Sequence, residues 1–143
     1  MMMDVRIALS ETERADVYKI RRSVFIDEQG VPESVEIDDK EEQSIHFIFY
    51  KESQPVGAAR LRLIDQAAKA ERVCILSSER SSGLGRLLMD KMEETAKQRG
   101  AEVMRLNAQT HAEAFYLAIG YTTVSSSPFL DAGIEHVTME KRL

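Results

Sequence analysis

The feature that most constrains this fold is a strand-turn-helix segment between Glu71 and Gly100. A short apolar run, 72–76, precedes a polar turn, Arg80-Ser81-Ser82-Gly83-Leu84-Gly85, and an amphipathic helix. The apolar face of that helix is predicted to contain Leu84, Leu87, Leu88, Met92, Thr95 and Ala96. A helix that starts at a glycine-rich turn has unpaired backbone N–H groups, so the segment predicts an anion site at this point.

Two arginines, Arg80 and Arg86, flank the start of the predicted helix, where the helix dipole is already positive and favours acidic residues. A bound polyanion would remove this conflict. The nucleotide motifs do not fit, because no Lys-Ser/Thr pair follows the glycines and Leu88 stands where a dinucleotide fingerprint has its third glycine. Glycine is also common in structural turns between a strand and a helix, so that interpretation stays open.

Length and composition indicate a single-domain globular protein. The chain has 143 residues, a net charge of −5, no 18-residue apolar run and no signal-peptide pattern. We therefore expect one domain over residues 1–143, a cytoplasmic location and no membrane partner. The acidic balance argues against a nucleic-acid partner. Cys74 is the only cysteine, which excludes an internal disulfide.

The order of predicted elements indicates an α/β (α+β) chain with a mixed, mostly antiparallel sheet flanked by helices. Capping boxes at Ser10-x-x-Glu13 and Thr110-x-x-Glu113 mark the starts of two helices. The helix between the two central strands requires a right-handed crossover, which makes those strands parallel. The expected elements are strands at 5–9, 45–50, 56–64, 72–76, 103–107, 121–124 and 134–139, helices at 11–28, 84–99 and 110–120, and a polar connection at 65–70.

The segment 27–42 has eight acidic residues against one base, Lys40, and is expected to be a loop with room for a short helical turn. Two interpretations are open. The acidic side chains can simply keep the loop solvated, or they can form an acidic mouth that attracts a cationic amine.

The turn motif Arg80-x-x-Gly83-x-Gly85 resembles the Arg/Gln-x-x-Gly-x-Gly/Ala signature of the GNAT superfamily of acyl-CoA-dependent N-acetyltransferases. The order of elements is similar to the GNAT fold over nearly the whole chain, and Val24–Pro32 further resembles the ElaA-like and YjcF-like members. The resemblance implies acetyl-CoA as cosubstrate and a small-molecule or peptide amine as acceptor. It also implies that coenzyme A contacts the turn and the preceding strand, namely Cys74, Ile75, Leu76, Arg80, Ser81, Ser82, Gly83, Leu84, Gly85 and Arg86.

A second motif, Ala114-Phe115-Tyr116-x-x-x-Gly120-Tyr121, looks like the family pattern whose tyrosine protonates the departing thiolate and contacts the cofactor. A phenol with a pKa near 10 suits a thiol with a pKa near 8.5. Without the resemblance, Tyr116 would be interpreted as a core residue. Asn107 matches a position that often hydrogen-bonds the cofactor in this family, and a strand-end turn residue is the alternative.

Glu71 is the candidate general base, because family members with an assigned base often place a glutamate on this strand. An alkyl amine is only about one part in a thousand neutral at pH 7, so removal of its proton has to be assisted. A salt-bridged Glu71 is the alternative. Because His46, His111 and His136 show no metal-ligand spacing, alone or with Cys74, no metal is expected.

Other interpretations of the chain remain open. His136 could line an acceptor pocket, and Cys74 with a histidine could form a nucleophilic pair. The same turn would also serve a non-catalytic module that binds coenzyme A or acyl-CoA for regulation. A small interaction domain with a coincidental Gly-x-Gly is a third interpretation, and exposed sheet edges could pair in a homodimer.

Overall fold

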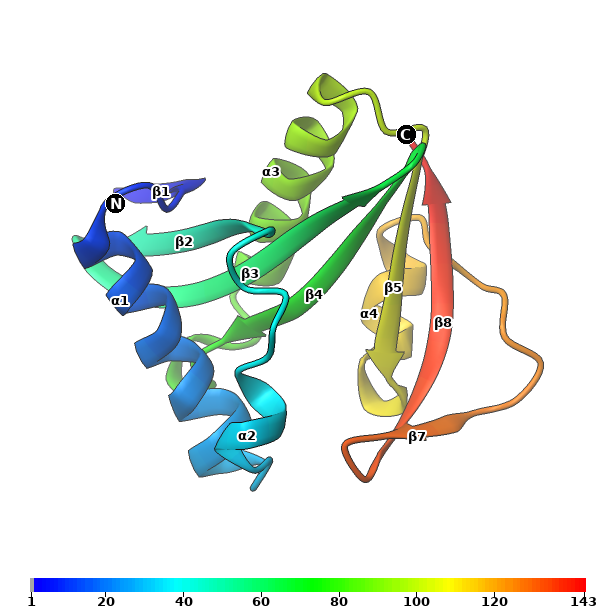
Figure 1. Cartoon of the computed structure of the whole chain (residues 1–143), viewed down its shortest axis with the longest axis horizontal. Helices are drawn as coiled ribbons and strands as arrows, with labels where there is room; N and C mark the ends of the chain where they lie inside the picture. Colours follow the sequence, from blue (N-terminus) through cyan, green and yellow to red (C-terminus); the bar gives the residue numbers. More distant parts are fainter. Residues whose placement is uncertain (1) are drawn as a thin grey trace.

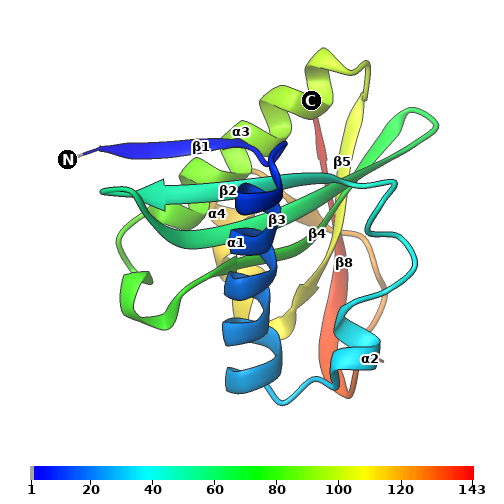
Figure 2. The same ribbon diagram turned by 60° about the vertical axis from the view of Figure 1, so that its left-hand side comes forward.

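The computed structural model describes residues 2–143, which form one eight-stranded sheet with helices on both faces (Figures 1 and 2). The strands are β1 (Met3–Ile7), β2 (Ile45–Lys51), β3 (Gln54–Ile64), β4 (Ala67–Ile75), β5 (Val103–Gln109), β6 (Thr122–Thr123), β7 (Phe129–Asp131) and β8 (Ile134–Arg142). The helices are α1 (Glu11–Arg21), the π-helix η1 (Arg22–Glu28), α2 (Glu33–Glu36), the 3-10 turn η2 (Ser77–Glu79), α3 (Leu84–Gln98), the 3-10 turn η3 (Thr110–Ala112) and α4 (Glu113–Ala118).

The sheet has the order β1-β2-β3-β4-β5-β8-β6, and β7 also pairs with β8. The predicted parallel pair is confirmed: β4 and β5 are parallel and are joined by α3, whereas every other pair among the described strands is antiparallel. The β4–β5 pairing runs only from Ala67–Val103 to Ala70–Leu106. Beyond this point the two strands separate, as Figure 1 shows.

A β-bulge bends β4 at the place where it leaves β5. Between the register pairs Ala58–Cys74 and Arg60–Glu71, one residue of β3 faces both Arg72 and Val73. Arg72 has a φ of 54°, in the left-handed region that costs a non-glycine residue about 1 kcal/mol or more. The bulge increases the local twist and so helps to open the sheet.

Each face of the sheet has its own hydrophobic core. On one face α1 and η1 bury Val17, Ile20 and Val24 against β2, β3 and β4. On the other face lie α3 and α4 (Figure 2), and the buried residues of α3 are Leu84, Leu88, Met89, Met92, Thr95 and Ala96. The prediction of Leu87 on this face was wrong, since it is 43% exposed. At 100° per residue, Met89 lies closer than Leu87 to the centre of the 84-88-92-96 stripe.

Two element boundaries differ from the predictions at the start of the site. The expected polar connection at 65–70 is mostly strand, because β4 begins at Ala67 and Asp65, with a φ of 56°, lies in a tight turn after β3. The side chains of Ala68 and Ala70 point into the α3 core and alternate with polar residues, as in a strand. The polar neighbours made this pattern hard to recognise in the sequence. The predicted helix at 11–28 is continuous, but from Arg22 onward it is a π-helix.

The C-terminal part also differs from the predictions. The Thr110 capping box was wrong: residues 110–112 form a 3-10 turn, and α4 starts after Ala112 without a side-chain cap. The Glu113 carboxylate instead accepts a hydrogen bond from the Thr123 hydroxyl. The connection between the last two predicted strands contains the short strand β7, which forms a hairpin with β8.

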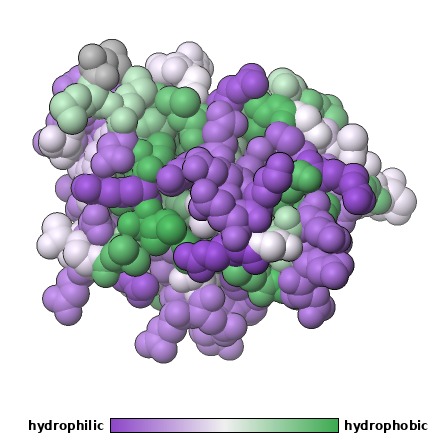
Figure 3. Space-filling view, turned by 90° about the horizontal axis from the view of Figure 1, so that it is seen from above, coloured by the Kyte–Doolittle hydropathy of each residue, from purple (hydrophilic) through white to green (hydrophobic). Residues whose placement is uncertain are grey.

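The outer surface is mixed in character. From above, hydrophobic residues appear in separate patches among hydrophilic side chains (Figure 3). Within residues 2–143, no helix is both long and apolar enough to cross a membrane.

Candidate active site

A cleft of about 960 Å³ opens where β4 and β5 separate. One wall consists of η1 and α2, and the other consists of the end of β5 with η3, α4 and the β7–β8 hairpin. The turn before α3 closes one end. The cleft therefore brings together the strand, turn and tyrosine predicted from the sequence. The predicted site residues that line it are Glu71, Cys74, Ile75, Arg80, Ser81, Gly83, Leu84, Gly85, Asn107 and Tyr116.

The start of α3 has the features of an anion site. Gly83 is its N-cap residue, with a φ of 79°, no side chain caps the helix, and the first turn contains no acidic residue. The first N–H groups of α3 lack intrahelical acceptors. A Cβ at Gly85 would lie 3.1 Å from the Phe115 ring, so the glycine allows Phe115 to pack closely at the mouth of the cleft.

Arg80 connects this turn to the opposite wall. Its Nε donates to the Ile75 carbonyl over 2.9 Å, and its two terminal nitrogens bind the Glu28 carboxylate at 2.6 and 2.7 Å. The pair spans from the turn to the end of η1. Both side chains are about 40% exposed, so a competing anion can reach the guanidinium.

Three other predicted cofactor residues lie outside the cleft lining, namely Leu76, Ser82 and Arg86. The N–H of Leu76 donates to the Val56 carbonyl at 2.9 Å, which leaves it unavailable to a ligand. Ser82 and Arg86 are exposed beside the turn.

Tyr116 lies on α4 with its ring in the core. The side chain is 8% exposed and makes edge contacts with Phe115 and Tyr121, at centroid distances of 4.9 and 5.7 Å. Its hydroxyl forms no hydrogen bond with any of residues 2–143, and the residue lines the cleft. Burial raises the pKa of this phenol, so the group is a neutral O–H donor at neutral pH.

Cys74 lies on β4 and is buried. Its Sγ–H donates weakly to the Ala58 carbonyl at 3.7 Å, and burial raises the pKa of the thiol to about 12. A neutral thiol is a poor nucleophile, and the geometry therefore does not favour the cysteine nucleophile considered from the sequence.

Asn107 is the first residue of β5 beyond the β4 pairing. Its Oδ1 accepts a hydrogen bond of 2.9 Å from the Thr138 hydroxyl. The Asn107 amide NH₂ forms no hydrogen bond within residues 2–143, so two donors are left at the cleft wall.

Glu71 is part of a cluster of cations. Its carboxylate lies 3.0 Å from Arg60, 2.7 Å from Arg62 and 3.4 Å from Lys69. Burial alone would raise its pKa, but the Arg62 hydrogen bond and the three cations lower the pKa to about 2. The salt-bridged alternative is thus the arrangement that the structure contains.

The acidic segment 27–42 is solvated in part, since Asp27, Glu28, Glu33, Asp39 and Glu42 are exposed, but most of its carboxylates are paired and it is not a free acidic mouth. Six of its eight carboxylates have basic partners; Asp27 and Glu42 have none among residues 2–143. Glu36 and Glu41 are buried against Arg21 of α1, and Asp38 and Glu41 hold Arg60 of β3. The other pairs are Glu28–Arg80, Glu33–Arg22 and Asp39–Lys40.

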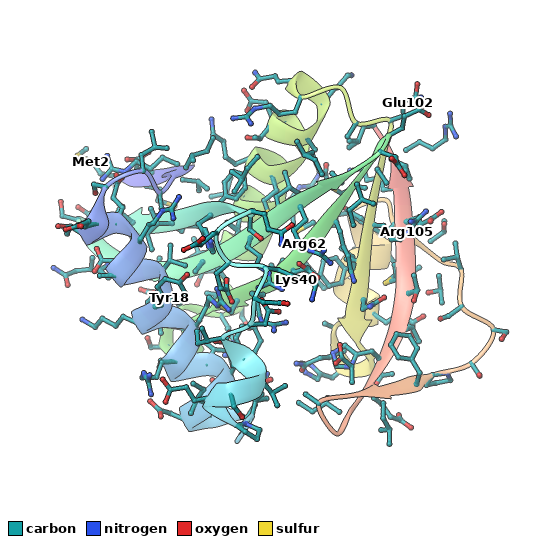
Figure 4. The ribbon with its side chains drawn as sticks, in the orientation of Figure 1. Met2, Tyr18, Lys40, Arg62, Glu102 and Arg105 are labelled. Carbon is teal, nitrogen blue, oxygen red and sulfur yellow. The ribbon has the colours of Figure 1, made fainter. Side chains whose placement is uncertain are left out.

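These contacts join into one ion network, fully buried only at Arg21, Glu36, Glu41 and Arg60, that sequence reasoning missed. It consists of Arg21, Glu36, Asp38, Glu41, Arg60, Arg62, Lys69, Glu71 and Arg72. A signal was present in the sequence: Arg21 falls on the apolar stripe of α1, and Arg60 shares a strand face with Ala58. In Figure 4, Arg62 and Lys40 lie in front of the central strands, close to the segment that carries the acidic residues.

Polar side chains also bridge the cleft. The Gln109 side chain of β5 donates to Gln29, after η1, at 2.9 Å, and the His111 Nε2 lies 2.6 Å from the side-chain Oε1 of Gln109. His136 lines the cleft beside Phe129, as considered from the sequence, and its Nδ1 lies 2.6 Å from the Ile134 carbonyl. His46 is a core residue bonded to the Glu41 carbonyl.

No group of three His, Cys, Asp or Glu side chains in residues 2–143 is placed to hold a metal.

The split sheet, the uncapped helix and the cleft between them define a mixed α/β protein whose candidate site lies where the two parallel strands part. Residues 9–143 match the acetyltransferase (GNAT) domain family, and the chain belongs to this family. It is 44% identical over 139 residues to the uncharacterized N-acetyltransferase YjcF of Bacillus subtilis (strain 168), covering 97% of this chain and 99% of that protein.

Two solved structures share the fold over nearly their whole lengths. A candidate N-acetyltransferase from Lactobacillus plantarum is 31% identical with a TM-score of 0.92, and covers 100% of this chain and 99% of that chain. Escherichia coli ElaA is 24% identical with a TM-score of 0.85, and covers 98% of this chain and 99% of that chain. The expected GNAT fold and the similarity to YjcF and ElaA are thereby confirmed.

Proposed function

We propose that this protein transfers the acetyl group of acetyl-CoA to a primary amine by direct attack. Family membership supports acetyl transfer. The observation that carries the proposal for this chain is the Tyr116 hydroxyl: its ring is buried, but the hydroxyl itself is open to the cleft and has no hydrogen-bond partner among residues 2–143. A hydroxyl that is open to the cleft and has no partner in the protein is free to donate to a ligand bound there.

Coenzyme A would lie along the opening between β4 and β5. The uncapped start of α3 and the Arg80 guanidinium are placed to hold its pyrophosphate. Beyond Ala70, β4 is still paired with β3, but its other side, which faces β5, has no partner strand. Backbone groups on that side are available to the pantetheine amides. The Asn107 amide lies on the facing wall.

The reaction needs one bond formed and one broken. The neutral amine attacks the thioester carbonyl carbon, and the tetrahedral intermediate collapses with loss of the C–S bond. We assign to the Tyr116 O–H the proton that the departing thiolate takes up, and the amine releases its own proton. Because a pKa near 2 makes Glu71 a weak base, we propose that water accepts that proton and that Glu71 holds the surrounding cations.

The test is acetyl-CoA binding combined with turnover. At one hundred times Kd, a ligand that binds only the folded state adds about 2.7 kcal/mol to stability, which raises the Tm by several degrees. Release of free thiol with any member of a panel of primary amines would indicate turnover. A product roughly 42 Da heavier than that amine, the mass added when acetyl replaces hydrogen, would establish transfer. Absence of any stabilisation by acetyl-CoA would contradict the proposal.

A non-catalytic module that binds acyl-CoA is the second candidate. It would use the same turn and the same split strands. Stabilisation by acetyl-CoA without thiol release in any amine would favour it over the enzyme.

A further inference from the structure

The ion network has more cations than anions, and two of its cations lie at the cleft. It contains five basic residues, Arg21, Arg60, Arg62, Lys69 and Arg72, and four acidic ones, Glu36, Asp38, Glu41 and Glu71. Arg62 and Lys69 have the Glu71 carboxylate as their acidic partner and share it with Arg60, which also binds Asp38 and Glu41.

Two cations of the ion network, Lys69 and Arg72, line the cleft. The Lys69 ammonium has one carboxylate contact, at 3.4 Å, and the side chain is 28% exposed. Arg72 uses its Nε and one terminal nitrogen on the α2 carbonyls, chiefly that of Glu36 at 3.2 and 3.1 Å. The same two nitrogens lie 3.3 Å from the Glu36 carboxylate and 3.5 Å from the Asp38 carboxylate. Its other terminal nitrogen forms no hydrogen bond within residues 2–143. Both residues therefore keep N–H donors that can face a ligand.

The carboxylates of the cleft are mostly neutralised. Glu28 binds Arg80, Glu79 binds Lys51, and Glu36 and Glu71 belong to the network. Of the acidic lining residues, Asp131 alone has no ion pair within residues 2–143, and it is exposed on the opposite rim. The pairing of the acidic segment thus reverses the charge that its composition suggests for the acceptor site.

We propose that the acceptor is an amine that carries an anionic group, a carboxylate or a phosphate, and that Lys69 and Arg72 bind this group. The inference rests on the proposed acetyl transfer and specifies the substrate class of the same site. The amine would reach the thioester near Glu71 and Asn107, where β4 and β5 part. Lys69 lies two residues back along β4, roughly 6 to 7 Å away, so a few methylene groups would separate the amine from the anion.

The same cations also favour the chemistry. Positive charge close to an amine disfavours its protonated form and so increases the fraction that can attack. An anion bound between Lys69 and Arg72 would leave the Glu71 cluster in place beside the amine. This arrangement removes the need for a side chain that acts as general base.

A set of amines with one chain length and different end groups tests the proposal. We would compare 4-aminobutanoate, butylamine and 1,4-diaminobutane, with 3-aminopropyl phosphate as the phosphate probe. The expected kcat/KM for the anionic amines is about tenfold or more above that of butylamine, since one hydrogen bond to a charged group accounts for this difference. The two anionic probes distinguish a carboxylate from a phosphate. Equal or better use of butylamine or the diamine would overturn the inference and leave acetyl transfer standing.

The Lys69→Glu variant should abolish the preference for the anionic amine, because it raises the KM of the anionic amine far more than that of butylamine. Lys19→Glu is the matched control, because it makes the same change of charge on the exposed side of α1, away from the cleft. A preference that survives in Lys69→Glu would contradict the assignment.

A binding measurement covers the case in which none of the four amines is acetylated. With coenzyme A at saturation, inorganic phosphate should raise the Tm of the wild type and of Lys19→Glu but not of Lys69→Glu. No effect in the wild type would overturn the inference. Failure of coenzyme A itself to bind would instead contradict the proposed function on which the inference rests.

Discussion

Two buried tyrosines five residues apart, Tyr116 and Tyr121, differ in what their hydroxyl groups contact. The Tyr121 hydroxyl donates to Glu93 at 2.7 Å, whereas the Tyr116 hydroxyl has no partner among residues 2–143 and belongs to a residue at the cleft. Their rings occupy the same core. Loss of one hydroxyl should therefore affect stability, and loss of the other should affect catalysis.

We expect Tyr116→Phe to lower kcat about a hundredfold or more, the usual contribution of a general acid, with little change in Tm. Tyr121→Phe is the control, and it should retain the rate while losing about 1 kcal/mol of stability with its hydrogen bond. Steady-state thiol release and thermal unfolding of both variants give the comparison. Full activity in Tyr116→Phe would remove this residue from the mechanism.

At this scale, prediction from the sequence depended on how local each signal was. Tyr116 and Gly83 lie in compact motifs, and a motif could find them. Arg21 and Arg60 are buried only because carboxylates from a distant segment, 27–42, fold over them. An isolated buried arginine would be unfavourable, so local patterns predict that these arginines are exposed. Neither periodicity nor spacing reveals their partners, because the partners lie far along the chain.

At the scale of elements, the turn before α3 is held by an ion pair with η1. Arg80 is shared between the Ile75 carbonyl and Glu28, which occupies the guanidinium that a pyrophosphate would need. A half-exposed pair of this kind contributes about 1 kcal/mol or less to stability. Its larger effect is on the electrostatic potential at the start of the helix.

Glu28→Gln should therefore bind coenzyme A a few times more tightly than the wild type, with little change in Tm. The variant frees Arg80 and removes a negative charge beside the anion site. Glu33→Gln is matched to it, because Glu33 forms a similarly exposed pair with Arg22 and is not a lining residue of the cleft. Calorimetric titration at low and high salt measures both. Weaker binding by Glu28→Gln would mean that Glu28 orients Arg80 for the cofactor.

Most elements followed from hydrophobic period and turn residues, but three departures cluster around the site. They are the early start of β4, the bulge at Arg72 and the π-helical end of the first long helix. Each one depends on a register or on packing between strands and helices far apart in sequence. Local sequence patterns do not show where one strand has an extra residue relative to its hydrogen-bonded partner. They also do not distinguish a π-helix from an α-helix, because the two have the same composition.

At the scale of the whole molecule, the ion network links stability to pH. Glu71 has its pKa lowered to about 2, and the pKa values of Asp38 and Glu41 are also lowered, in each case by hydrogen bonds and charges from arginines that outweigh the effect of burial. A carboxylate with a depressed folded-state pKa stabilises the fold at pH values above its unfolded pKa. That stabilisation is lost as the pH falls through the folded pKa.

We therefore expect the free energy of unfolding to fall between about pH 5 and pH 2, and Glu71→Gln to flatten this decrease. At pH 7 the variant should lose about 2 to 3 kcal/mol, because Arg60 and Arg62 keep their charges without this partner. Glu140→Gln, whose partner Arg105 is half exposed, should behave like the wild type. Urea unfolding across this pH range gives the comparison, and equal acid slopes for Glu71→Gln and the wild type would contradict the expectation.

The short β4–β5 pairing divides the sheet into two parts that are joined by four residue pairs. The part from β1 to β4 leads into the Arg80 turn. The part from β5 to β8 carries Asn107 and, on the helix after β5, Tyr116. A cofactor bound between the two parts would set the angle between them. We therefore expect the distance between a bound thioester and the Tyr116 hydroxyl to depend on this angle, and substitutions at the paired end of the two strands to alter the rate without contacting the cleft.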